Sequence, residues 1–556
     1  MSSPPPDHHA AQGAGGHADE PGFTPDERAL LARYCTNVDR PVFALRGLPE
    51  VVKGALFARY SRSPKSLRRL LLDEFVDDLP DGTAGAPDAP PAGGGGAGRA
   101  ERLYERVFGA YGDDSVAQLG GAHVALEQVS NLLTKVVEWG RLAAYLEQST
   151  RYIPYDDRPG GRYRYYRDPD VLAGPLGHEY VATLDAVFDT YASLLPRMRA
   201  WAERTYPQDA ETSDRAYGAT ITAKVCDVLR GLLPAATTSN VGMFASGQAY
   251  EGLLLRLRAH ELAEARAVGD ALLAELREVI PAFLTRVDRP DRGGAWSDYL
   301  AETRDATREV AAELLGDVEP EASDEVTLVD WDPDAEAELV TGMLYPHTHV
   351  PEEQLRRRVE RMSVEERWRV VRAYVGDRGN RRHKPGRALE RLTYRFDVCG
   401  DYGAFRDLQR HRMATIEWQP LTPRHGYATP PEIDAADADD PGIAAAWHRA
   451  LEAEGELAER LAADLPAQAQ YPVGFAYRLR YSVQLNARAA MHLIELRTQP
   501  QGHASYRRVA RRMHDLIASQ AGHPVVAEMM RFADHSATEL ERLEAERAAD
   551  RRAAER

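Results

Sequence analysis

Cysteine is scarce in this chain, which has only Cys35, Cys226 and Cys399 among its 556 residues. The three lie far apart and are odd in number, so they offer no metal-type pair and are typical of a reducing compartment. Long apolar runs are missing too, since none approaches the ~18 residues that a membrane helix needs. The N-terminal stretch contains neither the basic nor the apolar region of a secretory signal. We therefore expect a cytoplasmic protein with no membrane partner.

Positive charge is in deficit as well, because the formal net charge is -17 at pH 7. A nucleic-acid-binding surface needs an excess of Lys and Arg to displace counterions from phosphates, so we expect no nucleic-acid partner. The sequence also contains no Walker-type glycine loop, no GxGxxG after a strand, no HExxH and no GxSxG. These absences argue against P-loop, dinucleotide-fold, zinc-protease and serine-hydrolase chemistry, and we predict no metal site.

Changes in composition divide the chain into two globular segments joined by an acidic stretch that contains two prolines. Runs rich in Pro, Gly and Ala are typical of disorder or of flexible inserts, and dense charge is typical of an exposed tail. The predicted organisation is a disordered start at 1–22, a first segment at 23–315 with a flexible insert at 81–100, a linker at 316–336, a second segment at 337–540 and a charged tail at 541–556.

Helical and strand-like patterns alternate along both segments. Apolar residues recur at three- and four-residue steps within 115–148, 482–497 and 504–519, which predicts three amphipathic helices. The stretch 392–398 (LTYRFDV) alternates apolar and polar side chains and is rich in aromatic and β-branched residues, which predicts a strand. Interleaved helices and strands indicate an α/β or α+β fold rather than a helical bundle.

The most informative cluster is Arg410, His411 and Arg412. It supplies two planar guanidinium forks and a titratable ring within three residues, a set that suits a phosphate or an electron-rich ring system. On an ideal helix the three side chains would fan over roughly 200°. They can therefore meet one ligand only at a helix end or in a cleft, and the alternative is an exposed polar helix face.

A second cluster lies in the sequence LNARAAMHLIELR. Arg488, His492 and Glu495 follow one another at helical spacing and form a polar stripe, with Asn486 before it and Arg497 after it. A solvated stripe on a helix surface is the alternative interpretation.

A third candidate comes from the first segment, where Ser149 and Arg151 could hold a phosphate with a hydroxyl and a guanidinium group. The same residues are equally consistent with a helix-to-loop cap. Basic islands at 356–358 and 378–387 could bind a small phosphorylated anion or could be solvated helix ends.

The order of these clusters resembles the flavin-dependent thymidylate synthases. The signature of that family is Arg-His-Arg, a gap of seven residues, then Ser and a nearby Arg-Tyr, and much later Asn-x-Arg at a helix. Residues 410–412 match its first element, and Asn486 and Arg488 match the Asn-x-Arg. His492 and Arg497 fall at the later polar position and at the helix arginine of the family.

The first segment resembles the same family at a different point. The sequence VSNLLTKVVEWGRLAAYLEQSTRYI matches the region around the signature, with residues 139–141 (Trp-Gly-Arg) replacing Arg-His-Arg, while Ser149, Arg151 and Tyr152 are kept. In the second segment Pro420 stands at the serine position instead. The chain therefore resembles a tandem duplication with complementary losses, in which one site is built from both copies.

This resemblance implies two helix-rich α+β domains, each with a central and mainly antiparallel sheet. It also implies reductive methylation of dUMP to dTMP, with FAD as cofactor and with NADPH and methylenetetrahydrofolate as co-substrates. The site residues that it implies are Arg410, His411, Arg412, Asn486, Arg488 and His492 for FAD, Ser149, Arg151 and Arg424 for the nucleotide, and Arg497 for activation of the pyrimidine.

Two alternatives stay open at this point. One is a flavoprotein of the same fold that acts on another nucleotide or pyrimidine. The other is a non-catalytic scaffold whose arginines are structural, because Pro420 offers neither a hydroxyl nor a backbone N–H to a phosphate. Since the family's sites form between the subunits of a homotetramer, we expect a homodimer of this tandem chain.

Overall fold

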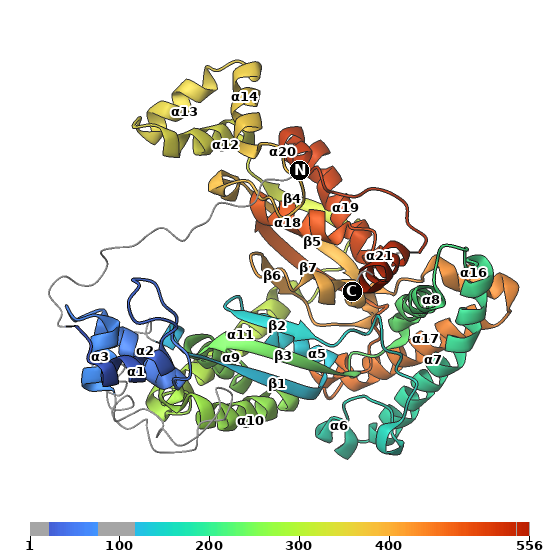
Figure 1. Ribbon diagram of the computed structural model, residues 1–556. Helices are drawn as coiled ribbons and strands as arrows, with labels where there is room; N and C mark the ends of the chain where they lie inside the picture. Colours follow the sequence, from blue (N-terminus) through green and yellow to red (C-terminus); the bar gives the residue numbers. More distant parts are fainter. Residues whose placement is uncertain (1–21, 76–116, 541, 555–556) are drawn as a thin grey trace.

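The computed structural model describes residues 22–75, 117–540 and 542–554, and two antiparallel sheets organise them. We call residues 22–315 the first repeat and residues 326–540 the second repeat. Figure 1 shows the sheet of the second repeat above that of the first. The insert predicted at 81–100 and nearly all of the predicted disordered start lie outside the described residues.

The sheet of the second repeat has the order β4-β5-β7-β6, and every neighbouring pair is antiparallel. The strand predicted at 392–398 is confirmed as β5, where Tyr394, Phe396 and Val398 are fully buried at every second position. Residues 326–331, which composition placed in the linker, form the edge strand of this sheet. The strands are β4 (Val326–Trp331), β5 (Thr393–Asp401), β6 (Thr415–Trp418) and β7 (Arg478–Asn486).

The first repeat has a smaller antiparallel sheet of order β1-β3-β2, made by β1 (Gly121–Ser130), β2 (Ala143–Glu147) and β3 (Thr238–Ser246). The helix predicted over 115–148 is wrong, because β1, the short helix α5 (Asn131–Val137) and β2 occupy that stretch. Gln128 has a positive φ of 57°, and the register shifts between Leu126 and Val129. This bulge lets both apolar residues face the core three positions apart, which imitates helical spacing.

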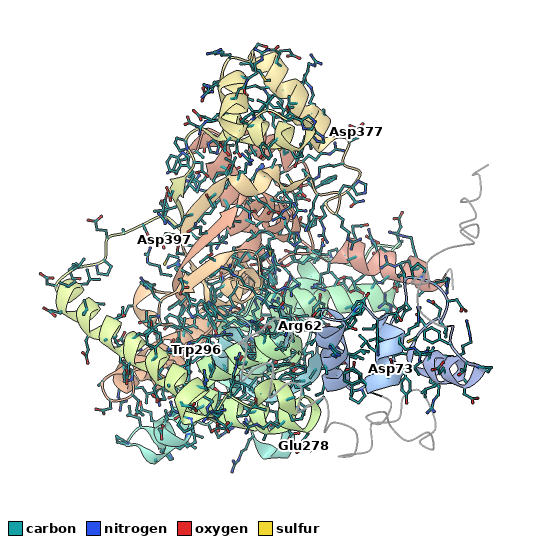
Figure 2. The ribbon with its side chains drawn as sticks, turned by 90° about the vertical axis from the view of Figure 1, so that its left-hand side faces the viewer. Arg62, Asp73, Glu278, Trp296, Asp377 and Asp397 are labelled. Atoms are coloured by element: carbon teal, nitrogen blue, oxygen red, sulfur yellow. The ribbon has the colours of Figure 1, made fainter. Side chains whose placement is uncertain are left out.

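Helices cover both sheets and fill the space beside them. In Figure 1, α7, α8 and α17 pack together at one end of the molecule, and Arg62 and Asp73 mark the small α1–α3 group at one side in Figure 2. The helices of the first repeat are α1 (Pro25–Tyr34), α2 (Glu50–Tyr60), α3 (Leu67–Glu74), α5, α6 (Pro169–Ala173), α7 (Gly177–Thr205), α8 (Asp214–Leu229), α9 (Gly247–Arg258), α10 (Ala263–Val279) and α11 (Ala295–Leu315).

The second repeat follows a similar plan. The helix predicted over 504–519 is confirmed with the same bounds, whereas the one predicted over 482–497 begins only at 487 because β7 includes the preceding residues. No described helix is both long and apolar enough to cross a bilayer. The helices are α12 (Ala335–Leu344), α13 (Glu352–Glu360), α14 (Val364–Val375), α15 (Tyr402–Leu408), α16 (Pro431–Asp439), α17 (Ile443–Ala462), α18 (Ala487–Arg497), α19 (Ala504–Ser519), α20 (Pro524–Met529) and, in the charged tail, α21 (Leu543–Ala554).

Two equivalent segments, 231–236 and 471–476, hold the repeats together across an approximate twofold axis. The backbone N–H of Ala235 donates to the carbonyl of Val473 at 2.8 Å, and the matching N–H of Phe475 donates to the carbonyl of Leu233 at 2.9 Å. The next N–H on each side repeats this pattern, from Ala236 to Tyr471 and from Ala476 to Gly231. The reciprocal bonds define which residue of one repeat corresponds to which residue of the other.

Candidate functional site

Residues 410–412 follow directly on a helix end. Asp401 caps the N-terminus of α15 by accepting from the N–H of Ala404, and α15 ends at Leu408 with Gln409 as its C-cap. The Gln409 amide donates to the carbonyl of Lys135 at 2.8 Å and so ties this turn to the first repeat. The Arg-His-Arg triplet therefore lies at a helix end, one of the two settings in which its side chains can meet a single ligand.

We call the cleft beside this turn the basic cleft, and it has a volume of about 310 Å³. Basic side chains from the turn and from α18 face apolar ones, among them Met413, Leu493 and Leu496. All seven second-repeat residues that the resemblance assigns to the flavin or to pyrimidine activation line it, namely Arg410, His411, Arg412, Asn486, Arg488, His492 and Arg497.

The start and length of α18 place its side chains in the cleft. The Asn486 side chain caps the helix by accepting from the N–H of Ala489 at 2.8 Å, which sets the point where β7 turns into α18. Arg488 and His492 then lie one turn apart on the cleft side. Glu495, which the sequence predicted in the same polar stripe, does not face the cleft. It is 1% exposed and accepts two hydrogen bonds of 2.6 Å from Arg378.

Histidine chemistry in the cleft is that of neutral imidazole. Arg497 Nε donates to His411 Nε2 at 2.8 Å, so that ring nitrogen carries no proton. Burial, together with the nearby Arg497, His492 and Arg410, holds the pKa of His411 well below its usual value. Burial and the cationic Lys384, Arg381 and Arg497 lower the pKa of His492 to about 4. Neither ring adds positive charge at neutral pH.

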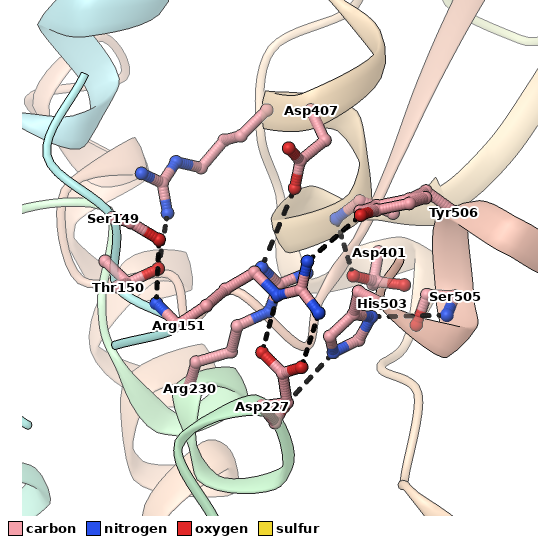
Figure 3. Close-up of polar contacts among 12 residues, drawn as sticks. Ser149, Thr150, Arg151, Asp227, Arg230, Asp401, Asp407, His503, Ser505 and Tyr506 are labelled. Atoms are coloured by element: carbon pink, nitrogen blue, oxygen red, sulfur yellow. Dashed lines mark hydrogen bonds and ion pairs between the residues drawn. The ribbon is translucent and has the colours of Figure 1, made fainter. Parts of the chain in front are cut away.

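The loop that follows β2 reaches across the repeat boundary into the second repeat. Arg151 binds Asp227 through two hydrogen bonds of 2.7 and 2.6 Å and donates to the Tyr506 hydroxyl at 3.0 Å. Arg406 donates to Glu147 at 2.9 Å and to Thr150 at 3.3 Å. Figure 3 shows Arg151, Asp227 and Arg230 facing Asp407 and Tyr506. We call Glu147, Thr150, Arg151, Asp227, Arg230, Arg406, Asp407, Arg410, Arg497 and Tyr506 the junction cluster.

Asp407 is the shared counterion of this cluster. Its carboxylate lies 2.6 Å from Arg410, 3.2 Å from Arg497 and 3.8 Å from Arg230. Burial alone would raise the pKa of Asp407, but the guanidinium groups of Arg410, Arg497 and Arg230 outweigh it and hold this pKa well below the usual range.

The junction cluster also carries more positive than negative charge. Arg151 pairs with Asp227, and Arg406 pairs with Glu147, which also binds Lys135. Arg410 and Arg497 share Asp407, and Arg230 lies near Asp407, Asp227 and Asp401. The buried Arg230 Nη2 and Arg410 Nε atoms have no hydrogen-bond partner among the described residues. Uncompensated buried charge is costly, so this arrangement favours an anionic ligand.

Two of the predicted nucleotide-binding residues are placed less favourably. Arg424 is exposed, forms an ion pair with Glu459 at 3.0 Å and does not line the basic cleft. The Ser149 hydroxyl accepts from the N–H of Arg151 at 3.2 Å, next to the junction cluster. The structure therefore brings the Arg151 loop to the second repeat and leaves Arg424 outside the basic cleft and the junction cluster.

The equivalent positions of the first repeat have lost the basic cleft. Ser246 caps α9 as Asn486 caps α18, and Gln248 stands at the position of Arg488. Trp139 replaces the first arginine of the triplet, and the Arg256 guanidinium lies 4.8 Å from its ring. Only the second repeat has the full set of basic side chains at these positions.

Arg230 and Asp407 are site residues that the sequence did not single out. Arg230 follows α8 at the start of the segment LRGLLP, and the reciprocal pairing of 231–236 with 471–476 carries it to the repeat boundary. Asp407 precedes the Arg-His-Arg triplet by three positions, one helical turn before Arg410. A charged residue beside each recognised motif is the signal that could have identified them.

Comparisons with known proteins agree with the division of the chain into two repeats. The family described as thymidylate synthase complementing protein matches the chain twice, at residues 74–282 and 327–523. UPF0159 proteins are similar over almost their whole length: those of Chlamydia muridarum and Chlamydia pneumoniae are each 39% identical, with 95% of this chain and 98% of each relative covered. The UPF0159 protein of Thermoplasma acidophilum is 30% identical, with 89% and 97% covered.

A solved structure of a flavin dependent thymidylate synthase from Helicobacter pylori, complexed with FAD and dUMP, is also similar. The identity is 17% and the TM-score 0.27, and the match covers 37% of this chain and 99% of that one.

Proposed function

Because the chain belongs to the thymidylate synthase complementing protein family, we propose that it is a flavin-dependent thymidylate synthase-like enzyme that converts dUMP to dTMP. In this proposal the basic cleft holds FAD and the junction cluster holds the nucleotide. The observation that carries it is the convergence of seven basic and polar side chains, from the 410–412 turn and from α18, on one cleft that adjoins the junction cluster.

The side chains of the basic cleft fit a flavin nucleotide. Arg412 and Arg488, with Lys384, offer cationic donors for a diphosphate, and planar guanidinium groups bind phosphate oxygens in pairs. Leu493 and Leu496 offer an apolar wall for a ring system. Neutral His411 accepts from Arg497 at Nε2, so its Nδ1–H can donate a hydrogen bond to the flavin ring without adding charge.

The junction cluster fits a phosphate monoester. Arg410 and Arg497 share the carboxylate of Asp407, and Arg230 lies near Asp407, Asp227 and Asp401. The guanidinium groups of the cluster still outnumber its carboxylates, which favours a phosphate. Each charge-assisted hydrogen bond contributes about 1.5–3 kcal/mol. Arg497 lies both in the basic cleft and in the junction cluster. It can therefore polarise a pyrimidine carbonyl of a nucleotide whose phosphate binds Arg230 or Arg151.

FAD supplies hydride chemistry when it is bound, with NADPH as reductant and methylenetetrahydrofolate as carbon donor. The chain itself orients the pyrimidine through Arg497 and excludes water at the repeat boundary. No cysteine lines the basic cleft among the described residues, and the thiols of Cys35 and Cys226 are buried. Positioning and fixed positive charge are therefore the contributions that this chain makes to catalysis.

The decisive experiment is a spectrum of the purified protein with and without dUMP, followed by an assay for dTMP with NADPH and methylenetetrahydrofolate. Flavin absorbance that changes on addition of dUMP, together with dTMP formation, supports the proposal. Colourless protein that does not take up added FAD would refute the flavin site. Rescue of a thymidine-requiring host tests the same activity in cells.

A flavoprotein acting on another nucleotide is the second candidate, and Asp407 is the observation that favours it. Its carboxylate already pairs with Arg410 and Arg497, two of the guanidinium groups that a dUMP phosphate would bind. Flavin binding without dTMP formation would support this second function. A homodimer of the tandem chain stays our prediction for the assembly, and light scattering of the purified protein tests it.

A further inference from the structure

Two histidines and an aspartate meet near the C-terminal end of the second repeat, and none of them lines the basic cleft. His514 and Asp515 belong to α19, and His535 belongs to the segment that follows α20. One possible ligand atom from each of the three residues lies within 4.8 Å of the other two. We call these three residues the histidine cluster and residues 530–536 the return segment.

Hydrogen bonds fix the backbone of the return segment on both sides of His535. Arg511 of α19 donates to the carbonyl of Asp534 at 2.8 Å and also to the carbonyl of Ser536. The N–H of Asp534 donates to the hydroxyl of Thr498, the C-cap of α18, at 2.9 Å. The return segment therefore lies against α19 and the end of α18, and His535 is held beside α19.

The His514 ring is oriented by a backbone carbonyl. Its Nε2 lies 3.1 Å from the carbonyl oxygen of Ala527. Because a carbonyl oxygen only accepts, Nε2 carries the proton and Nδ1 carries a lone pair. That Nδ1 faces Nε2 of His535 at 3.0 Å. A carbonyl that holds the far nitrogen of a histidine in this way is a common support for a metal-binding histidine.

A neutral His535 ring cannot satisfy both of its polar neighbours. Its Nε2 faces the lone pair of His514 Nδ1, and its Nδ1 lies 3.9 Å from the carboxylate of Asp515, which also only accepts. A neutral imidazole carries one proton, so one of these two contacts brings an acceptor against an acceptor. A cation among the three groups, either a bound metal ion or an extra proton, gives every lone pair a partner.

Distance, charge and access suit a metal ion. Tetrahedral Zn²⁺ places two imidazole nitrogens about 3.3 Å apart, and those of His514 and His535 are 3.0 Å apart. The Asp515 carboxylate forms no ion pair with Arg or Lys in the described part of the chain, so it can offset the charge of a metal ion. The side chains of His535 and Asp515 are 42% and 54% exposed, which lets an ion enter from solvent.

We propose that the histidine cluster binds one divalent transition-metal ion such as Zn²⁺, through His514, His535 and Asp515, with water completing the coordination. Two imidazoles and a carboxylate are ligands that this class of ion prefers. The two histidines lie 21 positions apart, a spacing that matches none of the metal motifs sought in the sequence, which is why the sequence predicted no metal site. The proposal does not depend on flavin or nucleotide binding.

The role of the ion is to fasten the return segment to α19. In Figure 1 the chain continues from this segment to α21, which packs on α8 of the first repeat. The same segment binds the C-cap of α18, the helix that ends with Arg497 in the basic cleft. A bound ion therefore stabilises the C-terminal closure of the two repeats, because it binds the folded arrangement and not the unfolded chain.

The test is calorimetric titration of the full-length chain with Zn²⁺ alone. The parent for this test carries alanine in place of His8, His9 and His17, because these histidines of the N-terminal stretch could also take up added metal. We expect one bound Zn²⁺ per chain and a loss of affinity of about 10- to 100-fold in His535→Ala and in Asp515→Asn. Zn²⁺ should also slow amide hydrogen exchange of residues 530–536 in the parent and leave it unchanged in His535→Ala.

His349→Ala is the matched control, because His349 is an exposed histidine outside the histidine cluster, and it should bind Zn²⁺ as the parent does. Electron paramagnetic resonance with Cu²⁺ as the probe should show two nitrogen ligands in the parent and one in His535→Ala. His514→Asn replaces His535→Ala if that variant does not fold. Equal affinity in the parent and in the cluster variants, or no uptake of Zn²⁺ at submillimolar concentration, would overturn the proposal. The second result would mean that the two rings share a proton instead.

Discussion

Replacing Asp407 by asparagine removes the shared counterion of the junction cluster and keeps its size. In the folded protein this carboxylate lies within 4 Å of three guanidinium groups, the nearest being that of Arg410 at 2.6 Å. Removing one partner of a buried ion pair costs about 3–5 kcal/mol, because the other charges stay buried. The side chain of Asp407 is 13% exposed, so we expect Asp407→Asn to lower the free energy of unfolding by about 3 kcal/mol.

The stability that Asp407→Asn loses should depend on pH in a defined direction. The pKa of Asp407 in the folded protein is held well below its usual value, whereas an unfolded aspartate titrates near ~3.9. A depressed carboxyl pKa contributes stability that is complete above the unfolded pKa and is lost as the pH falls toward the folded one. The difference between parent and Asp407→Asn should therefore be complete at pH 7 and shrink below about pH 4.

Urea unfolding with and without dUMP measures both effects. A bound phosphate supplies negative charge that the variant lacks, so dUMP should stabilise Asp407→Asn more than the parent. Deoxyuridine, which has no phosphate, should stabilise both proteins equally. Equal unfolding free energies at pH 7, or the same response of both proteins to dUMP, would refute the assignment of Asp407 as the counterion of the site.

Three further substitutions test the rest of the site. Arg412→Ala should release flavin, because Arg412 lines the basic cleft, and unchanged absorbance per mole of protein would contradict this. Arg151→Ala should weaken dUMP binding by about 10- to 100-fold, measured by calorimetry, while flavin stays bound. Arg378→Met leaves Glu495 buried without its partner and should cost about 3–5 kcal/mol in urea unfolding. The double variant Arg378→Met/Glu495→Leu should recover much of that loss, and no recovery would argue against the ion pair as the cause.

Local motifs were the part of the site that the sequence could predict. Residues 410–412 and the Asn486–Arg488 pair each lie within a few positions of one another, so their match to the family signature could be recognised from the sequence, although spacing alone fitted a solvated helix face equally well. Arg230 and Asp407 lie far apart in the chain, and they meet only because the repeats pair across the twofold axis. That meeting is a tertiary contact, which no local pattern contains.

The fold class was predictable, whereas the type of one element (115–148) and the start of another (482–497) were not. Two antiparallel sheets with many helices confirm the α+β expectation. The bulge at Gln128 shifted the apolar residues of β1 into helical spacing. At Asn486 the strand continues into a helix without a break in apolar pattern, and the capping preference of asparagine was the available signal for the boundary.

The covalent link between the two repeats has a consequence for how such a site can change over time. In an assembly of identical subunits every substitution appears in all sites at once. Here Trp139 can stand where its counterpart is Arg410, and Pro420 where its counterpart is Ser149, and neither change is copied to the other half. Each half is thus free to specialise, and we expect a stoichiometry of one flavin per chain rather than one per repeat.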